Sequence, residues 1–442
     1  MDDTTGTPTD SGTQLWQKAK ELIPGGSMLL SKRAEMYLPQ GWPAYFDRTQ
    51  GCSIWDLDGR EFTDVSLMGV GTNILGYSHP EVDQAVLETV RKGNLSTLNA
   101  PEEVYLAEKL IELHPWADMV RYARSGGEVC AIAVRIARAA TGKDKVAFCG
   151  YHGWHDWYLA ANLGETDSLD GHLLPGLDPN GVPRALAGTS IPFQFNDLEQ
   201  ITAIMEADDQ IGTIYMEVQR SDPPAPGFLE GVRALATQHN AVLIFDECTS
   251  GFRRTLGGMH LHYNVEPDLA TFGKTLGNGY AITAVIGRES VMQAAQKTFI
   301  SSTFWTERIG PTAALATLKV MEETDAPQRV HEIGIEVQQR WVELGATHNL
   351  VVTPGGLPAL ANFSIANYDP LAVKTYITQA MLELGYLASN AMYTSIAHTP
   401  EILNQYFDAL DTVFEKISHT SDPELSHLLP QGTAHAGFKR LT

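Results

Sequence analysis

A carboxylate and a lysine, each placed directly after an apolar run, are the first residues of this chain whose types and positions suggest chemistry. Asp246 follows the run Ala-Val-Leu-Ile-Phe, and Lys274 follows Asp-Leu-Ala-Thr-Phe-Gly. A buried carboxylate needs a positive partner, and a lysine shielded from water has a lowered pKa that makes its amine a nucleophile toward carbonyls. Taken singly, Asp246 also fits a helix cap and Lys274 a surface lysine with a buried stem.

A glycine segment after another apolar run suggests an anion site. Ser125, Gly126 and Gly127 follow a run that ends at Ala123 and precede an expected helix from Glu128. Glycine N–H groups can approach a phosphate closely, and a helix N-terminus adds partial positive charge. A plain turn between strand and helix is an equally good interpretation of these residues alone. The spacing matches neither a P-loop nor the dinucleotide-binding fingerprint.

Aromatic and imidazole side chains gather after a third apolar run, in the segment YHGWHDWY at residues 151–158. An aromatic ring there could stack on a planar ligand. Two alternatives stay open: packing beneath a loop, and a metal site formed by His152, His155 and Asp156. The metal site is the least favoured because no further clustered His or Cys completes the usual ligand set, so no metal is expected.

Together these features match one ligand. A phosphate cradle, a stacking ring, an acid for a ring nitrogen and an amine for an aldehyde are what pyridoxal 5′-phosphate requires. The acid keeps the pyridine nitrogen protonated, so that the ring accepts electrons, and the lysine condenses with the aldehyde. All four features coincide by chance far less often than any one of them.

Apolar runs that alternate with helical patterns must position these residues. Strands are expected at 119–123, 145–148, 211–216, 241–245, 269–272 and 283–286, and intervening helices include 128–140 and 229–239. This alternation predicts an α/β fold with a mostly parallel sheet covered by helices on both faces. Ligands of such sheets bind beyond the carboxyl ends of the strands, where the candidate residues lie.

The expected organisation is a disordered lead at 1–13, an N-terminal part of a small domain at 14–75, a large cofactor-binding domain at 76–324 and a C-terminal small domain at 325–442. Within the N-terminal part, Asp58-Gly59 lies between two strand-like runs. It predicts a hairpin with a type I′ turn, in which both central residues have positive φ. The C-terminal part predicts a smaller α+β region.

The composition and net charge of the chain limit the kinds of molecule that it is expected to bind. The chain has 442 residues, 43% hydrophobic and 19% charged, as in a folded soluble protein, and its net charge of −22 disfavours nucleic acid and anionic membrane surfaces. No apolar run is long enough for a membrane span, the N-terminus fits no targeting signal, and the four cysteines lack paired spacing. A cytoplasmic protein with reduced thiols is expected.

The sequence also resembles a known family. The run IFDECTSGFR with Lys274 in FGKTLGNG is similar to the signature of class III, fold-type I pyridoxal-phosphate aminotransferases, most of all glutamate-1-semialdehyde 2,1-aminomutase and its aminotransferase relatives. Supporting matches are PGG at 24–26, WDLDGREFTD at 55–64, GYSHPEV at 76–82, RSGGEV at 124–129 and YHGWHD at 151–156. The resemblance implies a large domain with a mostly parallel sheet and a smaller α+β domain built from both chain ends.

The resemblance also implies roles for individual residues. Lys274 corresponds to the Schiff-base lysine and Asp246 to the partner of the pyridine nitrogen. The other cofactor contacts implied are Ser125, Gly126 and Gly127 at the phosphate, Tyr151 and Cys248 on the two ring faces, and His152 and Glu217 lining the site. Family members share active sites across a homodimer, and Thr303 or Thr306 would reach the neighbouring subunit's phosphate, with Thr303 preferred.

Two departures from the family pattern bear on function. Gly127 stands where the family's phosphate loop has threonine, so a hydroxyl is lost. Lys32, with Arg33 beside it, stands where the aminomutase has an arginine for the substrate carboxylate, and lysine lacks the bidentate fork of arginine.

The lysine at position 32 favours an aminotransferase that moves an amino group between a small amine donor and an oxo acceptor, whereas the glycine at position 127 affects only cofactor affinity. A sugar or another polar carbonyl compound is one candidate acceptor, and Trp42, Trp154, Trp157 and Trp305 are compatible with sugar stacking or with ordinary packing. The alternative is a glutamate-1-semialdehyde-type aminomutase with intramolecular amine transfer. Outside this class stand an NAD-dependent dehydrogenase, although no GxGxxG follows a strand, and a non-catalytic scaffold.

Overall fold

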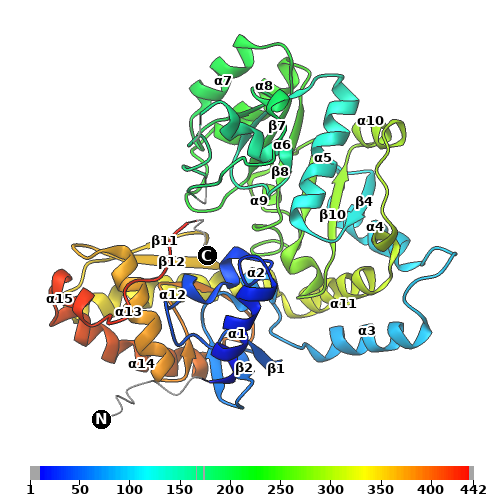
Figure 1. Cartoon of the computed structure of the whole chain (residues 1–442). Helices are drawn as coiled ribbons and strands as arrows, with labels where there is room; N and C mark the ends of the chain where they lie inside the picture. Colours follow the sequence, from blue (N-terminus) through cyan, green and yellow to red (C-terminus); the bar gives the residue numbers. More distant parts are fainter. Residues whose placement is uncertain (1–9, 166, 173–174, 438–442) are drawn as a thin grey trace. The chain divides into compact units, whose positions relative to one another are not determined.

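The computed structural model describes residues 10–165, 167–172 and 175–437 (Figure 1). The chain forms two compact units. One unit contains the described residues up to His79 together with those from Val330 onward, and the other is Pro80–Arg329. The functional residues expected beyond the strand ends all belong to the second unit.

The first unit has a four-stranded sheet of order β1-β2-β3-β13 and a three-stranded antiparallel sheet of order β11-β12-β14. Its core includes Trp341, Phe363 and Phe414, which pack between the smaller sheet and its helices. Its elements are α1 (Ser11–Leu22), η1 (Leu30–Lys32), η2 (Ala34–Met36), β1 (Phe46–Gln50), β2 (Ser53–Asp56), β3 (Glu61–Asp64), α2 (Met68–Gly71), α12 (Ala326–Thr347, which enters this unit at Val330), β11 (Val352–Gly355), β12 (Leu360–Ile365), α13 (Pro370–Glu383), β13 (Tyr386–Leu387), β14 (Ala391–Tyr393), α14 (Pro400–Ser418) and α15 (Asp422–His427).

The expectation of a disordered lead is wrong at its C-terminal end. Residues 1–9 lie outside the described residues, but α1 already begins at Ser11. Asp10 caps this helix, because its Oδ1 accepts a hydrogen bond from the N–H of Thr13 at 2.7 Å. Asp10, in the polar segment that was expected to be disordered, is therefore the N-cap of α1.

The predicted hairpin forms, but its turn type is wrong. Strands β2 and β3 pair antiparallel, with Trp55 opposite Glu61. Only Gly59 of the Asp58-Gly59 pair has positive φ, at 80°. The Asp56 carboxylate accepts the N–H groups of Asp58 and Arg60, at 3.0 and 2.9 Å, and thereby bends the chain into a longer turn than type I′.

The second unit is built on a seven-stranded sheet of order β4-β10-β9-β8-β7-β5-β6. Its elements are α3 (Pro80–Lys92), α4 (Glu102–Leu113), β4 (Met119–Ala123), α5 (Gly126–Thr141), β5 (Lys145–Cys149), α6 (Asp156–Leu159), η3 (Ala160–Leu163), η4 (Arg184–Leu186), β6 (Ser190–Pro192), α7 (Leu198–Ala207), β7 (Ile211–Glu217), α8 (Phe228–Gln238), β8 (Val242–Asp246), α9 (His260–Tyr263), β9 (Leu269–Phe272), η5 (Lys274–Gly277), β10 (Thr283–Gly287), α10 (Glu289–Met292), η6 (Gln293–Lys297), η7 (Thr303–Thr306) and α11 (Ile309–Thr324).

The prediction of a mostly parallel sheet is confirmed. Only β10 runs against its neighbours, β4 and β9, and the remaining pairs are parallel. Each expected strand lies within one residue of an observed one. Because β4 and β9 are both antiparallel to β10, the strands β4, β5, β7, β8 and β9 all end at the same edge of the sheet.

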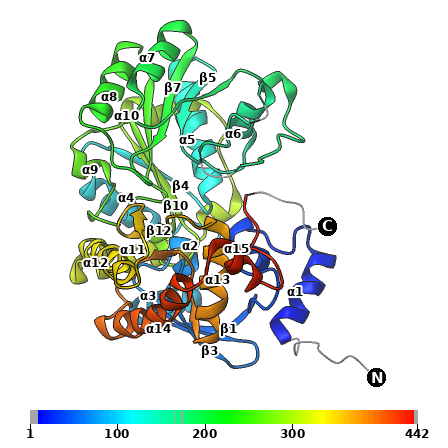
Figure 2. The same ribbon diagram turned by 90° about the vertical axis from the view of Figure 1, so that its left-hand side faces the viewer.

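Helices cover both faces of this sheet. Val242 and Ile244 of β8 pack in one cluster with α5, whereas Leu243 and Phe245, which alternate with them, are buried outside that cluster. Helix α5 contacts β7, β8 and β9, while α7 contacts β5 and α8 contacts β8. Figure 2 shows α7 and α8 on one side of β5 and β7 and α5 on the other.

Local sequence explains why α5 begins and ends where it does. Ser125 and Glu128 form a capping box at its start, and Gly142 ends it in the left-handed conformation, with φ 69°. Its buried residues recur at helical spacing, which fixes the face that meets the sheet. Across the part of the chain that the structure describes, no helix combines the length and apolarity needed to cross a membrane.

Candidate active site

The common edge of the parallel strands gathers the residues expected to do chemistry. Strand β4 leads into Ser125, β5 into Tyr151, β7 ends at Glu217, β8 ends at Asp246, and β9 leads through Gly273 into Lys274. Neighbouring strands pair in register, with Glu217 opposite Asp246 and Asp246 opposite Thr271. The fold therefore places these side chains along one continuous edge.

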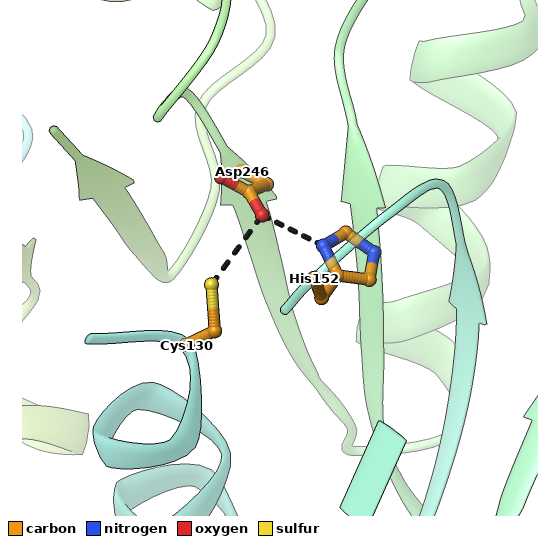
Figure 3. Close-up of side chains that lie close together, drawn as sticks. All are labelled: Cys130, His152 and Asp246. Atoms are coloured by element: carbon orange, nitrogen blue, oxygen red, sulfur yellow. Dashed lines mark hydrogen bonds and ion pairs between the residues drawn. The ribbon is translucent and has the colours of Figure 1, made fainter. Parts of the chain in front are cut away.

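Asp246 is buried and accepts hydrogen bonds at both oxygens (Figure 3). Its Oδ2 lies 2.7 Å from Nδ1 of His152 and 3.5 Å from Sγ of Cys130, which donates to it. Its Oδ1 accepts from the N–H of Cys248 at 3.0 Å and from Oγ1 of Thr271 at 3.2 Å. This set of donors holds the carboxylate in one orientation at the end of β8.

The donors outweigh the effect of burial on the acidity of Asp246. Burial alone raises the pKa of the carboxyl, but the hydrogen bond and the charge of His152, together with the Cys248 N–H, lower the pKa below its ordinary value. Nδ1 of His152 faces the carboxylate, and Nε2 faces the carbonyl of Cys149 at 3.1 Å. The ring of His152 thus lies between the carboxylate and this carbonyl, and it helps to fix the orientation of Asp246.

Lys274 stands at the start of η5 with an amine that is partly shielded from water. Its Nζ donates to Oγ1 of Thr249 at 2.9 Å. Burial, followed by the charges of Arg220 and Arg253, lowers its pKa to about 8. Its φ of 40° lies in the left-handed region, a conformation that is costly for a residue with a side chain and that is found preferentially at functional sites.

Lys274 and Asp246 meet at the turn that follows β8. Asp246 accepts the N–H of Cys248, and Lys274 donates to the next residue, Thr249. Cys248 also lies beside Gly273, where an added Cβ would stand 3.5 Å from its Sγ. One turn of four residues therefore links the carboxylate and the amine, and they do not occupy separate parts of the unit.

The N-terminus of α5 has the features of an anion cradle. Oε2 of Glu128 accepts the N–H groups of Arg124 and Ser125, at 3.1 and 2.9 Å. The N–H groups of Gly126 and Gly127 come next, in the first turn, where a helix supplies no acceptors of its own. A Cβ added at Gly126 would meet no heavy atom within 4 Å, so the space beside Gly126 is open. The arrangement fits a phosphate group.

Glu217 lies against the loop that carries Tyr151. Its Oε2 accepts the N–H of Tyr151 at 3.2 Å, and its Oε1 accepts from Nη1 of Arg220 at 2.7 Å. Gly150 has φ 108°, and a Cβ there would lie 2.6 Å from Oε2 of Glu217. Glycine is required at this position because the carboxylate approaches the backbone so closely. Tyr151 itself is half-buried and packs edge to face on Tyr158.

Thr303 and Thr306 are both exposed, at the two ends of η7. Oγ1 of Thr306 donates to the carbonyl of Thr303 at 2.9 Å. Nη2 of Arg124 donates to the carbonyls of Trp305 and Glu307, which ties this segment to the residue before the cradle. Contact of either threonine with a neighbouring subunit's phosphate stays a prediction.

Lys32 and Arg33 belong to the first unit. Lys32 is exposed at the end of η1, and the guanidinium of Arg33 packs over Gly25, where a Cβ would lie 2.3 Å from Nη2. Their role toward a substrate carboxylate stays a prediction. Of the tryptophans considered for sugar stacking, Trp154 is 68% exposed, whereas Trp42 stacks on Tyr37 and Trp157 is buried in the sheet core.

The alternative metal site at His152, His155 and Asp156 is not assembled. His152 faces Asp246, whereas His155 packs against Gly127 and Asp156 is exposed. Among the described residues, the three side chains close enough to share an ion are instead Cys130, His152 and Asp246. In this group, Asp246 already accepts from both partners.

Three contributors were not identified from the sequence. Cys130, Thr249 and Thr271 donate to or accept from the two central residues. Thr271 could have been found by aligning β8 with β9 in register, because Asp246 pairs with it. Thr249 follows Asp246 closely in sequence, but no pattern shows that a hydroxyl there would face Lys274.

Schiff-base chemistry on a phosphorylated pyridine aldehyde needs an amine of lowered pKa, an ionised acid and an anion cradle on one sheet edge. Their presence here, on a mostly parallel seven-stranded sheet, defines a pyridoxal-phosphate-dependent enzyme of fold type I. The chain belongs to the class-III aminotransferase family, which it matches over residues 39–420 and whose members use pyridoxal phosphate.

Known proteins resemble the chain in sequence and in fold. It is 37% identical over 380 residues to 3-aminobutyryl-CoA aminotransferase of Cloacimonas acidaminovorans, covering 84% of each chain. It is 36% identical over 422 residues to glutamate-1-semialdehyde 2,1-aminomutase of Methanothrix thermoacetophila, covering 90% of this chain and 95% of that one. The fold matches that of the FumI protein of Sphingopyxis sp. MTA144, with a TM-score of 0.83 at 24% identity over 94% of this chain and 99% of the other. The predicted family resemblance is confirmed.

Proposed function

We propose that the enzyme moves an amino group between an amine donor and an oxo acceptor, with Lys274 as the residue that carries protons. The observation that carries this proposal is the amine of Lys274, with its pKa lowered to about 8, which donates to Thr249 in the turn that follows Asp246, a carboxyl whose own pKa is lowered. An amine with this pKa can accept and return a proton near neutral pH.

Each group at the sheet edge has a task in this proposal. Pyridoxal phosphate, when bound, withdraws electrons from the carbon that bears the amino group. Asp246, supported by His152, holds a proton at the pyridine nitrogen. Gly126 and Gly127 bind the phosphate through their N–H groups, and Tyr151 packs on the ring. Lys274 removes the proton from the donor carbon and delivers it again.

Transfer between two molecules is favoured over intramolecular migration. The aminomutase arginine is replaced by Lys32, a point charge without a bidentate fork. The relative that is 37% identical is named as an aminotransferase. The acceptor is a small oxo compound, and both a polar oxo-sugar and a β-oxo thioester, the class indicated by that relative's name, belong in the test.

The enzyme acts as a homodimer in this proposal, with Thr303 or Thr306 completing the partner's phosphate site. Large apolar side chains support it, because Leu98, Phe299 and Phe304 of the second unit are 81%, 85% and 69% exposed. The four free cysteines fit a reducing cytoplasm.

The test is spectroscopic. Protein reconstituted with pyridoxal phosphate is reduced with borohydride, and the modified peptide is identified by mass spectrometry, which should find the label on Lys274. A separate sample of apoenzyme is loaded with pyridoxamine phosphate and challenged with oxo acids, semialdehydes, oxo-sugars and β-oxo thioesters. Retention of both the reducible chromophore and multiple turnover by Lys274→Ala would overturn the proposal. Turnover of a single substrate without an acceptor would favour the aminomutase. Binding of a nicotinamide cofactor in place of pyridoxal phosphate would favour a dehydrogenase.

A further inference from the structure

Gly127, in the first turn of α5, is pressed by a loop from outside the helix. A Cβ added at Gly127 would lie 2.9 Å from Nδ1 and 3.0 Å from Cε1 of His155. Gly153, with φ 100°, could not carry a Cβ either, because it would lie 2.8 Å from the Cα of Gly127. Two facing glycines thus let the His155 ring occupy the space of a side chain at position 127.

His155 is held in this position but its inner nitrogen has no partner. Its ring lies 4.4 Å from that of Trp154, at an interplanar angle of 31°. Nδ1 is buried, and no described residue forms a hydrogen bond with it. Burial lowers the pKa of the imidazole, against the opposing charges of Glu128 and Asp156. A buried nitrogen without a partner is costly, so a ligand there would relieve the cost.

The position of Nδ1 indicates which ligand. It lies 2.9 Å from the Cβ that a side chain at position 127 would carry, and position 127 is in the first turn of α5, whose N–H groups have no acceptor within the helix. We propose that His155 is a residue of the phosphate cradle, whose Nδ1 supplies the polar contact to the cofactor phosphate that Gly127 cannot supply. The inference rests on the proposed function, because it takes pyridoxal phosphate as the ligand at this helix terminus.

The alternative is that His155 only fills space, and the two roles separate by substitution. His155→Phe keeps a flat ring of similar size and removes the nitrogen, so pure packing predicts unchanged affinity for pyridoxal phosphate. A cradle role predicts a dissociation constant about 10- to 100-fold higher, the usual effect of losing a hydrogen bond to a charged group. His155→Gln, which retains a donor, should recover part of the loss.

A double substitution tests the shared space directly. Gly127→Thr alone forces a side chain against the His155 ring and should weaken binding. Gly127→Thr with His155→Ala removes the ring and supplies a hydroxyl, so binding should be tighter than in either single variant. Such non-additivity shows that the two positions share one space, and the His155→Phe and His155→Gln variants decide whether the nitrogen contacts the phosphate.

The measurements are the dissociation constant of pyridoxal phosphate, from absorbance titration of the apoenzyme, and the ³¹P NMR shift of the bound phosphate. His262→Phe, at an exposed histidine, is the matched control, and circular dichroism of each apoenzyme checks folding. Wild-type affinity and an unmoved ³¹P signal in His155→Phe would overturn this inference alone. Failure of the wild-type protein to bind pyridoxal phosphate would instead overturn the proposed function.

Discussion

At the scale of single residues, the chemistry depends on how far the protein lowers the pKa of one lysine. A pKa of about 8 leaves roughly a tenth of the Lys274 amines neutral at pH 7, against fewer than about one in a thousand for an ordinary lysine. The neutral form increases as pH rises through 8. The rate at which the apoenzyme reacts with pyridoxal phosphate should therefore rise and level off just above pH 8. A rate that keeps rising toward pH 10, as for free lysine whose α-amino group alone is acetylated, would contradict the assignment.

Arg220 contributes to this lowered pKa and can be removed separately. Its positive charge disfavours protonation of Lys274, and its loss also leaves the negative charge of Glu217 unopposed. Both effects raise the pKa of Lys274, so the pH profile of Arg220→Gln should shift to higher pH. Arg288→Gln, which removes an exposed pair with Glu266, is the control and should leave the profile unchanged.

Asp246 can be tested without a change of shape. Asp246→Asn keeps the size of the side chain but removes the charge opposite His152, so the pyridine nitrogen loses its proton partner. Turnover should fall on the order of 10²- to 10⁴-fold, the usual contribution of a positioned acid or base. Measurement of both kcat and the dissociation constant of pyridoxal phosphate separates a role of Asp246 in turnover from a role in cofactor binding. An Asn variant that binds the cofactor normally and retains full kcat would contradict both roles.

At the scale of elements, the capping box of α5 couples helix stability to the cradle. Glu128 binds the N–H groups of Arg124 and Ser125, and its Oε1 accepts from Nε1 of Trp305 at 3.4 Å. Glu128→Ala should lower the free energy of unfolding by about 1 kcal/mol, as for the loss of a helix cap, and should also weaken pyridoxal phosphate binding. Glu323→Ala, which removes an exposed ion pair, is the control and should change neither the free energy of unfolding nor cofactor binding. Denaturation and cofactor titration measure the two quantities.

The strands β5, β7, β8, β9 and β10 of the large sheet could be predicted because each is a short, largely apolar run that is buried almost throughout. The runs that end at Ala123 and Phe272 match β4 and β9 residue for residue. Elements that depend on a distant partner could not be predicted. Strand β13 has only two residues and exists because it pairs with β3, far away in the sequence. The turn after Asp56 differs from the predicted type I′ because the Asp56 carboxylate accepts two N–H groups of the turn, which the Asp-Gly pair alone does not indicate.

The same distinction applies to the site. Asp246 and Lys274 were predictable because each is a charged residue directly after an apolar run. A charge in that position is costly unless it has a partner or a function. Thr271 needed the pairing of β8 with β9 as well, and Thr249 and Cys130 could not be predicted, because their contacts depend on the form of the turn after β8 and on the rotation of α5. His155 was considered only as a metal ligand, since its contact with Gly127 depends on how closely two glycines approach.

At the scale of the whole molecule, the exposed apolar residues of the second unit should be covered by a second copy of the chain. Phe299 and Phe304 are the most suitable probes, at 85% and 69% exposure. Phe299→Asp with Phe304→Asp places two charges in the proposed interface and should convert the dimer to monomers in sedimentation velocity. Leu22→Asp, at an exposed leucine of α1, should leave the assembly unchanged. A wild-type protein that is already monomeric would contradict the proposed assembly.

If the dimer shares its sites, two variants with different defects, one without the amine and one with weak cofactor binding, should complement each other. Lys274→Ala lacks the amine, and Thr303→Ala should bind pyridoxal phosphate about tenfold more weakly because one phosphate donor is missing. In a mixed dimer, the site that contains Lys274 receives an intact Thr303 from the other protomer only if that residue acts across the interface. Purified mixed dimers should then contain one normal site each and show about half the wild-type amount of tight cofactor binding and amine turnover. If Thr303 acts within its own chain, mixing restores nothing, and the same experiment with Thr306→Ala decides which threonine reaches across.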